Sequence, residues 1–74
     1  HPQGPLPHEI ATLLYYASIV VAMLRCGTRI TSLGDDSLRR GVGWLLEQPW
    51  LEERTRSLLN EGLKFLDKHW PVPP

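Results

Sequence analysis

The apolar positions in the first third of the chain follow the period of an α-helix. Residues 10–24 carry no charged side chain. At about 100° per residue, seven of them fall on one face, which we expect to be the core stripe: Ile10, Leu13, Leu14, Ala17, Val20, Val21 and Leu24. Pro7 suits a first helical position, and Gly27 suits the C-terminal cap. The pattern predicts a helix over residues 7–26.

The opposite side of this predicted helix is also apolar. It carries Tyr15, Tyr16, Ile19, Ala22 and Met23, with Thr12 and Ser18 as polar relief. A helix that is apolar nearly all round is expected to be buried on more than one side. We therefore predict that Tyr15, Tyr16, Ile19 and Met23 belong to an interface with a protein partner.

A second, shorter helix is predicted over residues 37–48. Asp35, Asp36 and Ser37 offer N-cap chemistry and negative charge at its start, and Pro49 limits its length. Its apolar side carries Leu38, Val42, Leu45 and Leu46. The two glycines at 41 and 43 either permit close packing or weaken this helix by about 1 kcal/mol each.

Trp44 lies away from the apolar side of the second helix. It either packs over a neighbouring helix from the side or belongs to a contact surface, because Trp is enriched at binding hot spots. Trp44 is therefore the fifth candidate interface residue.

A third helix is predicted over residues 49–69, beginning at Pro49 and ended by Pro71. Its apolar residues recur at spacings of three, four and seven, which is typical of a helix: Leu51, Leu58, Leu59, Leu63, Phe65, Leu66 and Trp70. We expect Trp50 and Trp70 at the edges of the core.

Together these elements predict an all-α fold, a small antiparallel three-helix bundle that is long, short and long, and that dimerisation would complete. Pro-rich linkers are expected at 1–6 and 71–74, and these borders suggest a domain of a longer protein. Ile30 and Leu33, in the first connection, are available to cover the core edge.

Size and charge narrow the classes of partner. Below roughly 70–80 residues, a core alone contributes only a few kcal/mol, so a chain of 74 residues gains from a partner. Eight basic residues balance eight acidic ones, which argues against nucleic acid or an anionic membrane as the partner. With no secretory leader pattern, a cytoplasmic location is favoured over secretion.

Catalytic and metal chemistry find little support in the residues. Cys26 closes a helix, where the partial negative charge disfavours a thiolate, so we interpret it as structural despite His8 and His69. One Cys and three His do not make a converging zinc site. Gly41-Val42-Gly43 follows no strand and is no phosphate loop. We expect no enzyme activity, no metal and no cofactor.

Two binding alternatives remain open at this stage. Residues 37–69 superficially mimic a helix-turn-helix, but Glu52 and Glu53 would face the phosphates. The uncharged run 10–24 is shorter than the about 20 apolar residues that a membrane span needs. The sequence thus predicts a non-catalytic helical module for protein interaction or dimerisation. The alternative is an accessory or regulatory domain that docks on a catalytic domain of its parent enzyme.

Overall fold

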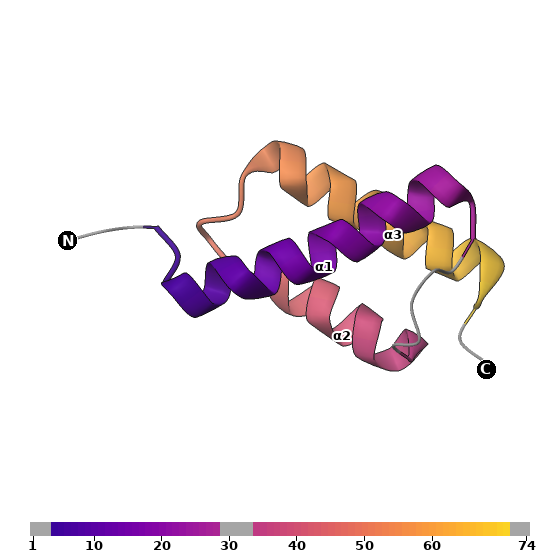
Figure 1. Ribbon diagram of the computed structural model, residues 1–74, viewed down its shortest axis with the longest axis horizontal. Coiled ribbons are helices and arrows are strands. Elements are labelled where there is room, and N and C mark those ends of the chain that lie inside the picture. Colours follow the sequence, from indigo (N-terminus) through magenta and orange to yellow (C-terminus); the bar gives the residue numbers. More distant parts are fainter. Residues whose placement is uncertain (1–3, 29–33, 72–74) are drawn as a thin grey trace.

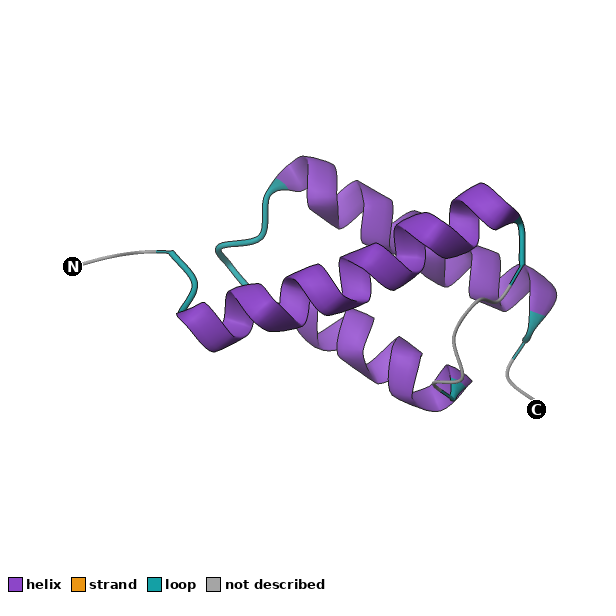
Figure 2. Ribbon diagram, in the orientation of Figure 1, coloured by secondary structure: helices purple, strands orange, loops and turns teal. Residues whose placement is uncertain are grey.

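The protein folds into three helices that run up, down and up (Figure 1). The computed structural model describes residues 4–28 and 34–71. Helix α1 is Pro7–Cys26, α2 is Asp35–Leu46 and α3 is Glu53–His69. The rest of the described ranges is loop and turn, without a strand (Figure 2). The predicted all-α three-helix bundle is therefore confirmed. Residues 1–3 and 72–74 of the predicted linkers, and Ile30 and Leu33, lie outside the described residues.

The two ends of α1 are those that the sequence predicts. Pro7 is its first residue, and the backbone N–H of Leu6 donates a hydrogen bond of 2.9 Å to Oε1 of Glu9. At the other end Gly27 has a φ of 70°, and its N–H donates to the carbonyl oxygen of Met23 over 2.9 Å. A left-handed φ suits glycine, which has no Cβ to clash. These caps fix α1 at 20 residues, or about 30 Å.

Helix α2 begins two residues earlier than predicted and ends two residues earlier. Asp35 and Asp36 are its first two residues rather than its cap. At its end, the side-chain amide of Gln48 donates to the carbonyl oxygen of Trp44 over 2.8 Å. The C-terminal carbonyls thus find side-chain partners, and the helix stops before Pro49.

The prediction that Pro49 begins the third helix is wrong. Helix α3 begins at Glu53, and residues 47–52 form the connection from α2. The backbone N–H of Leu51 donates to the carbonyl oxygen of Gln48 over 3.2 Å, which turns the chain at this point. Leu51 is 7% exposed, so the connection contributes a side chain to the core.

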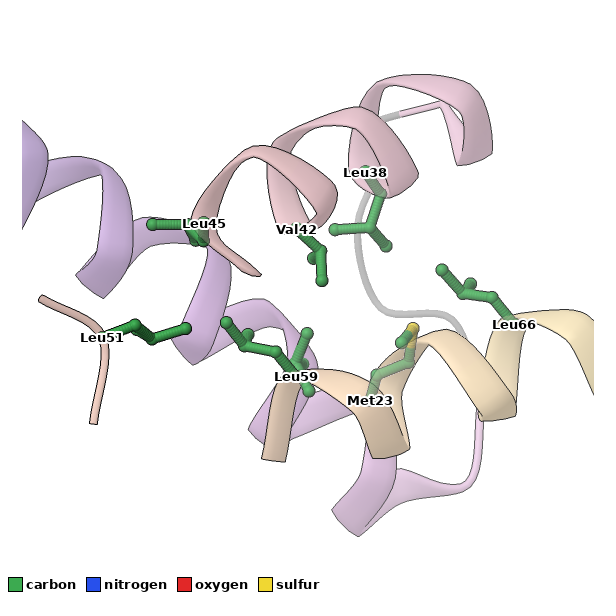
Figure 3. Close-up of a cluster of buried hydrophobic side chains, with 8 residues drawn as sticks. Met23, Leu38, Val42, Leu45, Leu51, Leu59 and Leu66 are labelled. Atoms are coloured by element: carbon green, nitrogen blue, oxygen red, sulfur yellow. The ribbon is translucent and has the colours of Figure 1, made fainter. Parts of the chain in front are cut away.

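The core is a single cluster of buried aliphatic side chains between the three helices (Figure 3). Its members are Val20, Met23, Leu38, Val42, Leu45, Leu51, Leu59 and Leu66. The predicted apolar sides of α2 and α3 supply five of them, which confirms the expected periodicity there. Trp50 and Trp70 are partly buried against this cluster, as predicted for core edges.

Helix α1 turns part of its predicted core stripe, Leu13, Val20 and Leu24, to the core, and the rest of the stripe faces outward. Ile10 and Leu14, expected in the core stripe, are 42% and 61% exposed. Val20 and Met23 are the buried residues of α1. Its partly buried side chains on the core are Leu13, Tyr16, Ile19 and Leu24. The core stripe is therefore rotated toward Tyr16 and Met23, which were expected on the opposite side.

Two glycines on the facing helices explain this rotation. A Cβ added to Gly41 of α2 would lie 2.1 Å from Cζ of Tyr16, and one added to Gly62 of α3 would lie 2.7 Å from Cγ1 of Val20. Both distances are shorter than the closest approach of two non-bonded carbon atoms. Each α1 side chain therefore packs directly against a glycine, which we call its seat. Because α1 is apolar on all sides, the shape of its neighbours decides which side faces inward.

Candidate functional site

The five candidate interface residues do not share one surface. Met23 is fully buried, and Tyr16 and Ile19 are half-buried against the core. Tyr15 is 52% exposed, and its ring meets the edge of Tyr16 at a centroid distance of 5.0 Å. Trp44 is 39% exposed on α2. The structure thus leaves two of the five, Tyr15 and Trp44, largely accessible, and they lie on different helices.

The accessible apolar surface of α1 lies on the side away from the core. We call it the α1 outer face, and its members are Ile10, Leu14, Ala17, Ser18, Val21 and Ala22. A shallow open groove of about 480 Å³ runs along it, lined by Leu14, Ala17, Ser18, Val21, Ala22, Arg25 and Cys26. Ile10, Leu14, Ala17 and Val21 are spaced by four, three and four, so they form one stripe.

Sequence reasoning assigned most of this stripe to the core rather than to the surface. No signal in α1 itself distinguishes the two sides, since both are apolar. The sequence feature that could have indicated the inward side lies in the other two helices. Their glycines Gly41 and Gly62 leave room for side chains of α1.

The α1 outer face has little catalytic potential. Its groove is lined by one charged residue, Arg25, and by the thiol of Cys26 at the C-terminal end. Among the described residues that line it, there is no carboxylate or imidazole to act as a general base toward that thiol. Elsewhere in the described residues, no three His, Cys, Asp or Glu side chains converge as a metal site would require.

A second surface lies on α2. We call it the α2 outer face, and a shallow hollow of about 540 Å³ on it is lined by Asp36, Arg39, Arg40, Gly43, Trp44 and Glu47. The guanidinium of Arg40 pairs with the carboxylate of Asp36 at 2.7 Å, one helical turn away. Both of these side chains are largely exposed. A Cβ added to Gly43 would meet nothing within 4 Å.

Two arginines that could have contacted a nucleic acid bind the protein instead. Arg39, only 18% exposed, pairs with Asp67 and donates to the carbonyl oxygen of Trp70 over 2.6 Å. Arg56 donates to the carbonyl oxygens of Leu46 and Gln48. These contacts join α2 to the two ends of α3, so both guanidinium groups have structural roles.

Helix α1 also has the length and composition of a membrane-crossing helix. Its 20 residues include an 18-residue window with a mean hydropathy of 1.5, of which 11% is buried in the bundle. The same length and composition occur in core helices of soluble proteins.

Comparisons with protein-family models, with curated proteins and with solved structures found no match.

Proposed function

We propose that this protein is a non-catalytic helical interaction module that binds a protein partner through the α1 outer face. The observation that carries this proposal is the exposure of Ile10 and Leu14, at 42% and 61%, on a helix whose outward side is apolar. Covering each of these side chains would contribute about 1 kcal/mol. Interface cores are depleted of charge, as this stripe is.

A bilayer is the competing occupant of the same face, favoured by the length and hydropathy of α1. Two features favour protein instead. The uncharged run 10–24 extends over about 22 Å, whereas the hydrocarbon core is about 30 Å thick. Helices that lie on a membrane surface are typically rich in Lys and Arg, whereas Arg25 is the one basic residue that lines the groove.

The test places a photo-crosslinking amino acid at Leu14, with Asn60, an exposed residue of α3, as the control position. A protein crosslinked from position 14 and not from position 60 supports the proposal. A crosslink to another part of the same polypeptide would identify the alternative, an accessory domain docked on its parent.

A parallel measurement separates protein from lipid. The unaltered chain and the Leu14→Gln variant are each mixed with neutral phosphatidylcholine vesicles and floated on a density gradient. If the chain floats and Leu14→Gln does not, the α1 outer face contacts lipid and the proposal is wrong. Equal crosslinking from positions 14 and 60 would also contradict it.

A further inference from the structure

The α2 outer face carries a glycine that the fold itself does not explain. Of the three glycines inside the described helices, Gly41 and Gly62 are seats for Tyr16 and Val20. Gly43 has open space where a Cβ would be. A glycine inside a helix costs about 1 kcal/mol relative to alanine. Its absent side chain therefore leaves room for something that lies outside the chain.

The residue next to this gap is a large, accessible aromatic side chain. Trp44 is 39% exposed and is absent from the apolar residues packed on the core. Trp44 and Gly43 line the same hollow. One surface thus presents both a projecting ring and a recess beside it.

The charges of the α2 outer face are arranged for an antiparallel copy of itself. Arg40 and Glu47 are seven residues apart, two helical turns, and therefore project from the same side of α2. The midpoint between them lies between Gly43 and Trp44. An antiparallel α2 turned about a two-fold axis at that midpoint brings Arg40 of each copy opposite Glu47 of the other.

Glu47 is available for this contact. Within the described part of the chain, its carboxylate makes no ion pair, whereas Arg40 has only the exposed pair with Asp36. The same two-fold axis brings the two Trp44 side chains together on one side of the contact and the two Gly43 residues together on the other, because these consecutive residues are about 100° apart on the helix. The formal net charge of zero means that two copies do not repel each other at long range.

We propose that the α2 outer face pairs with the same face of a second copy of this chain, in an antiparallel, two-fold symmetric contact. Arg40 and Glu47 form two identical ion pairs across it, and the two Trp44 rings pack against each other on one side of these pairs. Because α2 has 12 residues and spans about 18 Å, the contact is smaller than a standard interface of about 800 Å² per partner. The dimer is therefore weak and forms with rising concentration. This inference uses a different surface from the proposed function and does not depend on it.

Sedimentation equilibrium from micromolar to millimolar concentration tests the pairing, with Cys26 kept reduced so that a disulfide cannot join two chains. We expect a reversible dimer that weakens as salt is added, because the ion pairs are exposed. In a dimer of either single variant, Arg40→Glu or Glu47→Arg, side chains of like charge face each other at both ion-pair positions. We expect each variant to raise the dissociation constant at least about tenfold.

The decisive experiment mixes the Arg40→Glu and Glu47→Arg variants. In a mixed dimer, each charge that one variant reverses meets the complementary charge of the other, so association returns to the level of the unaltered chain. Lys64→Glu and Glu61→Arg, on the exposed side of α3, repeat the same net charge changes elsewhere and leave the dimer intact. Gly43→Ala adds a methyl group where the two helix backbones approach each other, so it weakens association while the helix itself becomes more stable.

The inference is wrong if the unaltered chain stays monomeric to millimolar concentration, or if neither charge reversal weakens the dimer. It is also wrong if the two variants fail to associate when mixed. A dimer lost with Leu14→Gln but kept with Trp44→Ala would overturn the inference and assign self-association to the α1 outer face, so the two proposals can fail separately.

Discussion

The phenol ring of Tyr16 occupies the space where Gly41 would carry a side chain, since a Cβ at that glycine would lie 2.1 Å from Cζ of the tyrosine. This contact joins the middle of α1 to the middle of α2. A rigid aromatic ring that is itself packed on the core has little freedom to move aside. The contact therefore requires a residue without a Cβ at position 41 of α2.

Gly41→Ala should destabilise the fold, although alanine is the better helix former. We expect a loss of about 1–3 kcal/mol from overpacking, which is much larger than the helical gain. The matched control is Gly43→Ala, two residues away in the same helix and without a neighbour. It should stabilise the fold by up to about 1 kcal/mol. Urea denaturation at low protein concentration measures both, and equal effects would show that Tyr16 is not seated on Gly41.

Met23→Ala should be far more damaging than Leu14→Ala, although both residues are large and apolar. Met23 is fully buried, so its truncation leaves a cavity and is expected to cost about 2–5 kcal/mol. Leu14 is 61% exposed, and its truncation should change stability by less than about 0.5 kcal/mol. Thermal melts followed by circular dichroism compare the two. A larger loss of stability in Leu14→Ala than in Met23→Ala would mean that α1 has the orientation that its sequence predicts.

Arg39→Met should loosen α2 from the end of α3. It removes the ion pair with Asp67 and the hydrogen bond to the carbonyl oxygen of Trp70, and we expect a loss of about 1–2 kcal/mol. Asp67→Asn keeps the bond to the Trp70 carbonyl and should cost less. A urea series on both variants checks this ranking. A larger loss in Asp67→Asn would contradict this account, because Arg39→Met removes both contacts and Asp67→Asn weakens only one of them.

Arg56→Lys should weaken the connection between α2 and α3 even though the charge is kept. The guanidinium donates to the carbonyl oxygens of Leu46 and Gln48 through two different nitrogens, whereas lysine presents one compact ammonium group. We expect a loss of about 1 kcal/mol. Amide hydrogen exchange at the C-terminal end of α2 should quicken. Unchanged exchange there would show that this end of α2 is held by other contacts.

The periodicity of the sequence was sufficient for the number of helices and for the core sides of α2 and α3. Leu38, Val42 and Leu45 are buried as their spacing predicts. For α1 the same reasoning identified the element and both of its ends and placed Leu13, Val20 and Leu24 correctly on the core, but it also placed the exposed Ile10 and Leu14 there. Periodicity identifies the core side of a helix only when the opposite side is polar, and α1 has no polar side. The inward face is set by Gly41 and Gly62, and their effect appears only when the helices are placed together.

The candidate surfaces were harder to find from the sequence for the same reason. Trp44 could be singled out because it lies off the apolar side of a helix that has one. Leu14 could not, because any side of α1 looks equally suited to the core. Met23 was chosen as an interface residue and is a core residue, which follows directly from the rotation of α1.

The seating of α1 on two glycines also bears on how this sequence can change over evolutionary time. The fold constrains the inner side of α1 through Tyr16 and Val20, whereas no contact within the described residues requires the exposed Leu14 to stay apolar. Mutational drift at position 14 is therefore a record of selection from outside the chain. In descendants that keep both glycines, polar replacements there would mark a surface without a partner, and persistent leucine or isoleucine would mark one that is used.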